Sequence, residues 1–385
     1  MLPPDCLSLK MKKTDYYSYQ LNDMPKGCRQ CVNGEKLVLF VTGKCDNSCY
    51  YCPLSDQKKN KDSVWANEWK ISNKKDVVEE ARLCSSKGAG ITGGDPLLRL
   101  DRTVKYIELL KSKFGKDFHI HLYTPLNLVT RLKLKKLHEA GLDEIRFHPN
   151  LEKPEEWGRI LIAKSFDWDI GIEVPVIPHM HKELRNLMKF SKEHVNFINL
   201  NELEMSENNA CRLSDYNYKP KNSLSYGVAG SEQLAKSLLK SLSKSHVNVH
   251  FCTAKLKDAV QLRNRIKRRA KNVAQKFDKI TEDGTLMRGV IYLKSLMPGP
   301  EYKLRLQTAK KNFFLKRLYK IKKDIKLEYN LDFDSIYVDR NKLRILASYS
   351  DVKKMASYLK EKNLVPAIVE EYPTHDALES EIDFL

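Results

Sequence analysis

Three closely spaced cysteines are the residues of this chain best suited to chemistry. The segment Cys45–Cys52 reads CDNSCYYC, so Cys45, Cys49 and Cys52 form a Cys-x3-Cys-x2-Cys motif. Three thiolates cannot supply all four cysteine ligands of a [4Fe–4S] cluster, but they can hold three of its irons and leave the fourth open. The alternatives are a zinc loop, which usually uses pairs of Cys-x2-Cys, or three unrelated cysteines. The spacing favours the cluster.

The remaining composition indicates a globular protein in a reducing compartment. The 385 residues predict two or three domains, and 68 Lys and Arg against 49 Asp and Glu give a net charge of +19. The N-terminal MLPPDCLSLKMKK has no apolar signal core, and no apolar run approaches the ~18–20 residues of a membrane helix. We therefore expect a cytoplasmic protein without a membrane partner. Its nine cysteines then favour metal or redox chemistry over disulfides.

Alternating strands and helices are predicted to position the cysteine motif. The predicted strands are Leu37–Thr42, Ala89–Thr92, His119–Tyr123, Glu144–His148, Ile170–Ile177, Phe197–Asn201 and Val247–Phe251. The predicted helices include Asp76–Ser86, Arg102–Phe114, Thr130–Ala140 and Lys182–Glu193. This pattern predicts an α/β fold with a complete or partial (β/α) barrel, in which functional residues follow the strands. The cysteine motif directly follows the first predicted strand.

A different pattern follows residue 282 and predicts a C-terminal α+β module. Its predicted strands and helices are Leu286–Leu293, Tyr302–Leu327, Ser335–Val338, Leu343–Ser348, Asp351–Glu361 and Leu364–Glu370. The order β-α-β-β-α-β fits a ferredoxin-like module. The predicted domains are an N-terminal extension at 1–27, a core at 28–254, a basic helix and linker at 255–282, and the accessory module at 283–385.

A second motif connects the chain to a known family. The element Thr92-Gly93-Gly94-Asp95-Pro96 follows the second predicted strand. Together with the cysteine motif and the aromatic Tyr51 before its last cysteine, it resembles the radical S-adenosylmethionine (SAM) enzymes and their Gly-Gly-Glu-Pro element. Asp95 is one methylene shorter than the usual Glu. Within this family, the chain is similar to archaeal proteins related to pyruvate formate-lyase activating enzyme.

The resemblance implies a set of cofactor contacts. It implies that Cys45, Cys49 and Cys52 ligate a [4Fe–4S] cluster whose open iron takes the amino and carboxylate groups of SAM. It also implies that Tyr51 lies near the adenine, and that the element of Gly93, Gly94, Asp95 and Pro96 binds the SAM amino group. The implied reaction is reductive cleavage of SAM to methionine and a 5′-deoxyadenosyl radical, which abstracts hydrogen from a substrate. A low-potential electron donor of the ferredoxin or flavodoxin type is the implied partner.

Polar residues at the other strand ends are further candidates. Polar groups inside apolar strands face a partner or a cavity. We expect Thr124, Arg146 and Glu173 to line the cofactor site, with Arg146 pairing the SAM carboxylate because a guanidinium matches a carboxylate bidentately. The alternative is that they are ordinary edge or capping residues. Other polar residues in these strands are Tyr123, His148, Asn199, Asn201 and Glu202.

The spare cysteines admit three interpretations. Cys28 and Cys31 form a Cys-x2-Cys before the first predicted strand, and Cys252 ends the last one. These three are candidate ligands of a second, auxiliary cluster. The candidate fourth ligands are Cys211, Cys6 and His250. The alternatives are a zinc site or free thiols. Cys84 lies in an amphipathic pattern, and we interpret it as a buried, inert thiol.

The substrate hypotheses follow from the charge. Residues 255–330 contain 22 Lys or Arg and 7 Asp or Glu, with basic clusters at 263–269 and 316–323. Concentrated basic charge suits RNA or a nucleotide-like substrate. The alternative explanation of the charge is a solvated helix face. The alternative functions are a glycyl-radical-type activase or other protein-modifying radical enzyme, and a non-catalytic metal-binding RNA-binding protein. We favour the RNA- or nucleotide-directed radical enzyme at this point.

Overall fold

The computed structural model describes residues 10–385 and divides the chain into two compact units. The first unit ends at Arg265, and the second runs from Ile266 to Leu385. This boundary falls within the predicted linker, which contains α8 (Ala254–Leu256), the π-helical segment η4 (Lys257–Leu262) and α9 (Arg263–Val273). Cys6 lies outside the described residues. Across the described part of the chain, no helix is long and apolar enough to cross a membrane.

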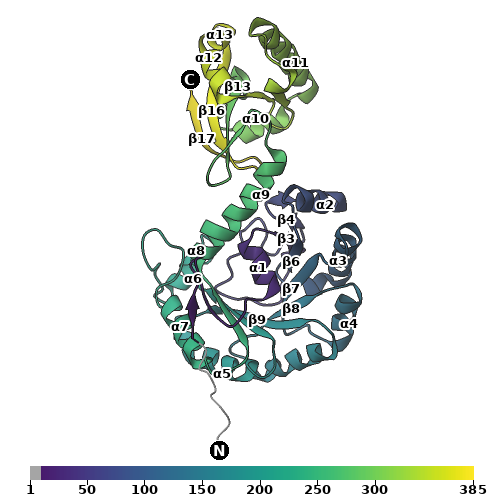
Figure 1. The fold of residues 1–385 in the computed structure, drawn as a ribbon, viewed down its shortest axis with the longest axis vertical. Coiled ribbons are helices and arrows are strands. Elements are labelled where there is room, and N and C mark those ends of the chain that lie inside the picture. Colours follow the sequence, from purple (N-terminus) through teal and green to yellow (C-terminus); the bar gives the residue numbers. More distant parts are fainter. Residues whose placement is uncertain (1–9) are drawn as a thin grey trace, which may run out of the picture. The chain divides into compact units, whose positions relative to one another are not determined.

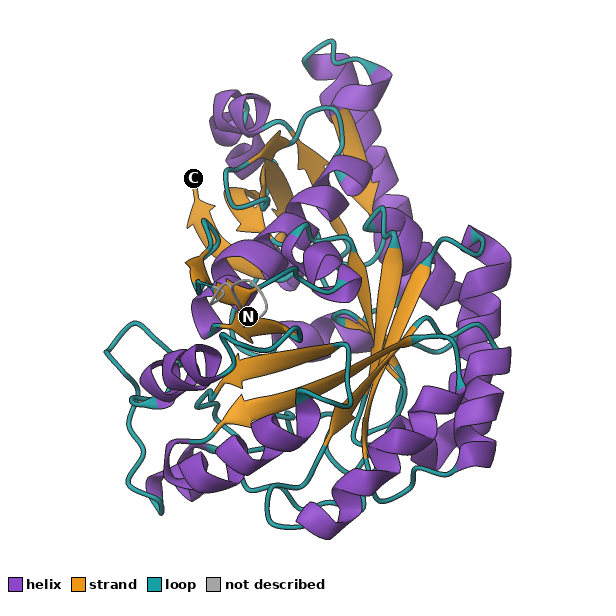
Figure 2. Cartoon of the chain, turned by 60° about the horizontal axis from the view of Figure 1, so that its bottom comes forward, coloured by secondary structure: helices purple, strands orange, loops and turns teal. Residues whose placement is uncertain are grey.

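A curved sheet with a central block of parallel strands forms the first unit (Figures 1 and 2). The parallel strands are β3 (Lys36–Phe40), β6 (Gly88–Thr92), β7 (His119–Pro125), β8 (Glu144–His148), β9 (Asp169–Val176), β10 (Phe197–Glu202) and β11 (Asn248–Cys252). Their order in the sheet, β11-β10-β9-β8-β7-β6-β3, follows the order of the chain. Because β3 and β11 do not pair with each other, the predicted α/β barrel is confirmed in its partial form.

Helices cover the outer face of this sheet because each presents one apolar side. They are α2 (Lys74–Leu83), α3 (Leu100–Phe114), α4 (Arg131–Glu139), η2 (Pro154–Ser165), α5 (His181–Ser191) and α7 (Ser231–Ser241). In α2, for example, Val77, Val78 and Ala81 are buried, while Asn73 and Asp76 form a capping box at its start. The short helix α1 (Lys26–Val32) instead lies inside the curve of the sheet (Figure 1).

Very short strands that sequence periodicity did not predict extend both edges of the parallel block. β1 (Lys12–Lys13) and β2 (Tyr19–Leu21) add antiparallel pairs beside β11, and β4 (Trp65–Ala66) and β5 (Trp69–Lys70) do so beside β3. Strands of two or three residues show no alternation, so only tertiary pairing defines them.

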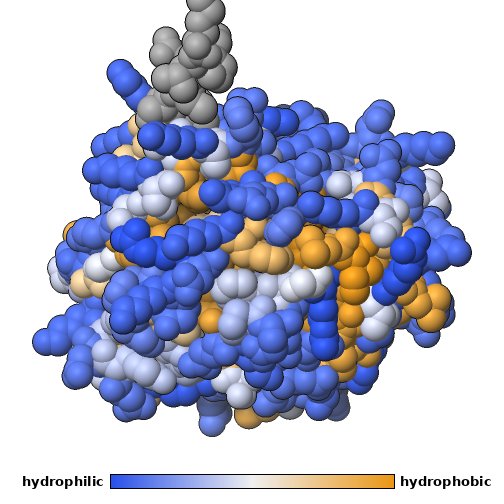
Figure 3. Space-filling view, turned by 90° about the horizontal axis from the view of Figure 1, so that it is seen from below, coloured by the Kyte–Doolittle hydropathy of each residue, from blue (hydrophilic) through white to orange (hydrophobic). Residues whose placement is uncertain are grey.

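On the face in Figure 3, hydrophilic side chains predominate and apolar areas lie between them.

The second unit is an antiparallel sheet with helices. Its elements are β12 (Lys279–Ile280), β13 (Leu286–Leu293), α10 (Tyr302–Thr308), α11 (Lys311–Glu328), β14 (Ile336–Asp339), β15 (Arg344–Ala347), α12 (Tyr349–Lys354), α13 (Ala356–Glu361), β16 (Leu364–Glu371) and β17 (Glu379–Phe384). The strand order is β14-β15-β13-β16-β17, with β12 beside β13. Each predicted long helix is two helices. The backbone is extended at Ala309, between α10 and α11, and the break between α12 and α13 falls at Met355, where φ is −85° and ψ is −1°. The ferredoxin-like assignment stays a prediction.

A buried charge network in the second unit yields a stability prediction. The Arg344 guanidinium is fully buried and lies 2.9 Å from Asp339, 2.6 Å from Glu371 and 3.0 Å from Glu379. Arg344→Ala leaves Asp339 without its cation, while Glu371 keeps Arg288 and Glu379 keeps Lys342. Because a buried ion-pair network is broken, we expect the unit to lose about 3–5 kcal/mol of stability. Hydrogen exchange of β13 and β16 measures this directly, and Arg340→Ala, at an exposed neighbour, is the control. Unchanged exchange in Arg344→Ala would contradict the prediction.

Candidate active site

A cavity of about 670 Å³ opens at the C-terminal ends of the parallel strands. Its lining comes from the loops and ends that follow β3, β6, β7, β8, β9 and β10. This volume lies within the range of small-molecule and cofactor sites, about 300–1,000 Å³. The position is the one at which parallel α/β folds carry their functional residues.

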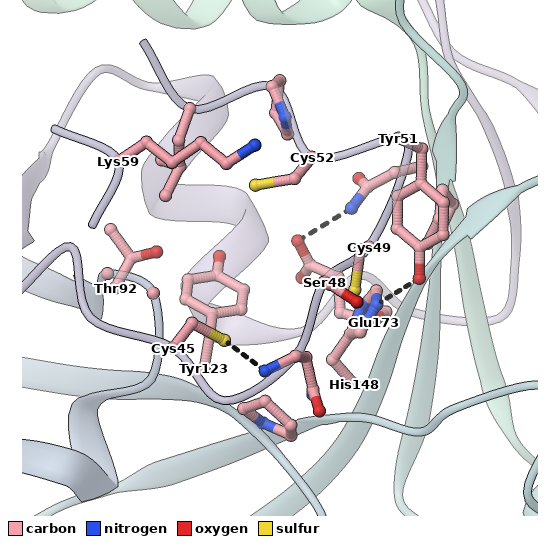
Figure 4. Close-up of a pocket in the computed structure, with 18 of the residues that line it drawn as sticks. Cys45, Ser48, Cys49, Tyr51, Cys52, Lys59, Thr92, Tyr123, His148 and Glu173 are labelled. Carbon is pink, nitrogen blue, oxygen red and sulfur yellow. Dashed lines mark hydrogen bonds between the residues drawn. The ribbon is translucent and has the colours of Figure 1, made fainter. Parts of the chain in front are cut away.

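The loop after β3 brings the three motif cysteines to this cavity. Cys45, Cys49 and Cys52 are half-buried and line the same cavity (Figure 4). Gly43 starts the loop and bonds through its backbone to Lys61 at 2.8 Å and to Asn60 at 3.0 Å. A side chain at Gly43 would place its Cβ 1.7 Å from the Lys58 carbonyl oxygen, so only glycine closes this loop.

The loop after β6 packs against the cysteine loop without side chains between them. The backbone amide of Gly94 donates to the Thr42 carbonyl at 2.7 Å, and that of Asp95 donates to the Lys44 carbonyl at 2.8 Å. A Cβ on Gly93 would lie 2.5 Å from the Thr42 oxygen, and one on Gly94 would lie 2.3 Å from the Lys44 oxygen. The two motifs found in the sequence are therefore neighbours in space, with glycine required at both positions.

Asp95 carries a buried carboxylate oxygen without a partner. Its Oδ1 accepts from the Leu97 amide at 2.9 Å and from the Thr124 hydroxyl at 2.9 Å. Its Oδ2 is buried and has no hydrogen-bond partner, and burial raises the pKa of this carboxyl group. Gly94 and Thr124 line the cavity, while Pro96 starts the buried turn η1 (Pro96–Arg99) behind it. Such an oxygen is costly to bury alone and would be stabilised by a cationic donor.

Tyr51 and Glu173 form another part of the lining. The Nδ1 of His148 lies 2.9 Å from the Glu173 backbone carbonyl, which only accepts, so this nitrogen carries the proton. The Nε2 of His148 is then the acceptor for the Tyr51 hydroxyl at 2.9 Å (Figure 4). The Glu173 carboxylate accepts from the Asn201 amide at 3.0 Å. Tyr51, Thr124 and Glu173 thus line the cavity, and their contacts with a cofactor stay a prediction.

Arg146 does not reach the cavity, and the pairing predicted for it is not supported. Its guanidinium is buried beneath the cavity lining and pairs with Glu144 at 2.5 Å and Glu173 at 2.8 Å. It also lies 3.2 Å from the Tyr123 hydroxyl and 3.4 Å from the Cys28 sulfur. With two carboxylates on it already, this guanidinium has no free face for a ligand carboxylate. Its expected role as a ligand-binding residue is corrected to that of an internal ion-pair partner.

The spare cysteines lie apart from the cavity. Cys28 and Cys31 are on α1, Cys252 is buried at the end of β11 next to Gln261, and Cys211 is exposed on α6 (Ala210–Ser214). His250 bonds Ser18 at 2.7 Å and Asn199 at 2.8 Å. Within residues 10–385, no three His, Cys, Asp or Glu side chains converge on a site for one metal ion. Thiolates that bind different irons of a cluster need not converge in this way, so the second cluster stays a prediction.

The sequence analysis did not single out several residues that line the cavity. Lys59, Glu204, Arg212 and Lys257 all contribute, and Lys257 pairs with Glu204 at 2.6 Å. Lys59 extends into the space beside Cys52 (Figure 4). Lys59, Glu204 and Arg212 lie in segments without periodicity, and Lys257 lies in the predicted basic helix and linker without having been singled out. Only the basic character of CPLSDQKKNK, directly after the motif, was a visible signal for Lys59.

Comparisons with known proteins agree with this geometry. Residues 39–166 match the family model described as the radical SAM superfamily. A protein of Methanocaldococcus jannaschii named "Putative glycyl-radical enzyme activating enzyme" is 46% identical over 285 residues, which cover 72% of this chain and 76% of the relative. Biotin synthase of Pseudoalteromonas translucida is 29% identical over 136 residues, 34% of this chain and 36% of the relative. A solved methylornithine synthase structure is 12% identical with a TM-score of 0.35, covering 60% of this chain and 79% of that one.

Proposed function

The chain belongs to the radical SAM superfamily, and from this membership we propose that it is an enzyme that abstracts hydrogen from a protein substrate. When bound, the [4Fe–4S] cluster would supply the electron that cleaves SAM to methionine and a 5′-deoxyadenosyl radical, and this radical takes the hydrogen from the substrate. The electron comes from a low-potential donor of the ferredoxin or flavodoxin type. We also propose that the enzyme acts in the cytoplasm.

We propose Cys45, Cys49 and Cys52 as the cluster ligands. Their sulfurs share one cavity, and thiolates are the donors that iron–sulfur clusters require. Burial raises the pKa of Cys45 to about 11 and also raises that of Cys49, so these thiols are protonated near neutral pH without metal. Cluster binding therefore releases protons.

We propose the adjoining part of the cavity as the SAM site. The observation that carries this proposal is the buried, unpartnered Oδ2 of Asp95, which fits an ammonium group. Asp95 is 1% exposed and is not itself a lining residue, but its neighbours Gly94 and Thr124 line the cavity. Gly93 and Gly94 line this part of the cavity, and their missing side chains let the turn pack directly on the cysteine loop. Tyr51, Thr124 and Glu173 complete the proposed contacts, and Pro96 fixes the turn that holds Asp95.

The choice of a protein substrate is supported by the 46% identical relative, whose name describes an activating enzyme. RNA is the second candidate because of the exposed face of α11, where Phe313 and Tyr319 lie among Lys316, Arg317 and Lys320. The other basic cluster is largely engaged within the fold. There, Arg265 pairs with Glu68, and the buried Arg269 donates to the Pro373 carbonyl.

Transfer of deuterium distinguishes these substrates. The reconstituted enzyme is incubated anaerobically with dithionite, SAM and a pool of synthetic peptides deuterated at glycine Cα. We expect deuterium in 5′-deoxyadenosine, because a hydrogen abstracted from the peptide enters that product. SAM cleavage without deuterium transfer would contradict the glycyl substrate. Binding of a tRNA transcript that weakens steeply with salt would then favour the RNA-directed alternative.

A further inference from the structure

An exposed apolar segment lies between β10 and α7. Residues 204–227 contain only one short helix, α6, and place three large apolar side chains in solvent. The exposed fractions are 49% for Tyr216, 96% for Leu224 and 64% for Tyr226. Apolar side chains gathered on one exposed segment are a feature of interaction sites, whereas single exposed ones need no explanation. We call residues 204–227 the rim segment.

Specific contacts fix the base of the rim segment against the cysteine loop. The fully buried Asn209 donates to the carbonyls of Tyr51 and Glu204, both at 3.0 Å. The ring of Tyr216 stacks on that of Tyr50 at a centroid distance of 4.6 Å. These contacts tie the rim segment directly to the loop that carries the three cysteines.

The farther part of the rim segment is anchored as well. Lys221 pairs with the buried Glu202 at 2.7 Å, and a Cβ on Gly227 would lie 2.4 Å from a Glu202 carboxylate oxygen. Glu204 and Gly227 form an isolated antiparallel bridge that closes the base of the segment. Leu224 and Tyr226 are therefore exposed on a segment that is anchored at both ends.

The rim segment is continuous with the cavity. Glu204 and Arg212 belong to the segment and also line the cavity, and Leu203 next to it does so too. The Tyr226 carbonyl accepts from the Met205 amide at 2.8 Å, next to the cavity-lining Glu204, so a molecule held on this segment lies beside the site. An electron donor needs no entry to the cavity, whereas the molecule that loses hydrogen must reach it. This position favours the substrate as the occupant.

The charge of the rim segment identifies the chemical class of that occupant. The segment contains three acidic and three basic residues and thus has no net charge. A surface for RNA would need an excess of Lys and Arg to neutralise phosphates. An exposed tyrosine beside an apolar leucine, on a segment without net charge, fits the core of a protein–protein contact, where aromatic residues are enriched and charged ones depleted.

We propose that the rim segment is the docking surface for the polypeptide whose hydrogen is abstracted, with Leu224 and Tyr226 as its main apolar contacts. The inference rests on the proposed function, since it takes the substrate to be a protein. The docked polypeptide lies across the segment and delivers one residue into the cavity past Glu204 and Arg212.

A double variant, Leu224→Ser with Tyr226→Ser, tests this inference. Both side chains are largely exposed, so the variant should fold and cleave SAM at the wild-type rate without peptide. With the peptide pool deuterated at glycine Cα, we expect its KM to rise at least about 10-fold, because apolar contacts are lost, with kcat unchanged. Leu132→Ser is the matched control, since Leu132 is 67% exposed on α4.

The outcomes separate the two proposals. Deuterium transfer with the same KM in wild type and double variant would overturn the docking surface and leave the protein substrate intact. An equal rise in KM for Leu132→Ser would also overturn it, because the effect would not be specific to the rim segment. No deuterium transfer in the wild type, with SAM cleavage retained, would contradict the glycyl substrate on which both proposals rest.

Discussion

Replacing Cys45, Cys49 or Cys52 with alanine is expected to reduce the iron content from about four per chain to below one and to abolish SAM cleavage. Each thiolate of a three-cysteine site holds a different iron, so no remaining cysteine of the motif can take over. The three sulfurs line one cavity on a loop whose closure Gly43 permits, and the loss is therefore local. Iron and acid-labile sulfide after anaerobic reconstitution measure the effect.

Cys211→Ala is the matched control, because Cys211 is exposed on α6 and lies outside the cavity lining. When the wild type holds about four irons per chain, this variant should retain the wild-type iron and sulfide content. About eight irons and eight sulfides in the wild type would show a second cluster, and Cys28→Ala and Cys252→Ala should then reduce that number by about half. Zinc without sulfide in the wild type would contradict the radical reaction altogether.

The parallel core was predictable because its strands are buried on both faces. β8 begins at Glu144 and ends at His148 as predicted, since Ile145 and Phe147 alternate with polar residues between turn residues on either side. The helix α1 was not predicted, because seven residues containing a Cys-x2-Cys show no helical periodicity. Its position inside the curved sheet depends on contacts distant in the chain, such as that of Cys28 with Arg146.

The candidate site was predictable where a motif requires particular residue types. It was not predictable where a residue's role depends on how deeply its side chain is buried and which side chains already pair with it. The cysteine motif and the Gly93–Gly94 pair are recognisable because few residue types can replace them. For Arg146, the strand position predicted an inward direction but could not show that Glu144 and Glu173 already pair with it. The rim segment was not predicted, because the exposed Leu224 and Tyr226 do not recur with the periodicity of a helix or a strand.

Asp95→Asn is expected to weaken SAM binding by about 10- to 150-fold and to leave the iron content unchanged. The substitution keeps the size of the side chain and the acceptor for the Leu97 amide, but it removes the negative charge. A charge-assisted hydrogen bond to an ammonium contributes about 1.5–3 kcal/mol, which gives the expected range. Equilibrium dialysis of the clustered protein with SAM, without reductant, measures binding separately from turnover.

The location of Asp95 makes this prediction specific to the site. Its Oδ2 is a buried carboxylate oxygen without a partner, whereas the carboxylate of Asp101 on α3 is mostly in solvent. Asp101→Asn removes the same charge from the same unit and should leave SAM affinity unchanged. Equal affinity in Asp95→Asn and wild type would assign the SAM amino group to another acceptor. A loss of iron in Asp95→Asn would instead show that Asp95 supports the cysteine loop, against which its own backbone is hydrogen-bonded at Lys44.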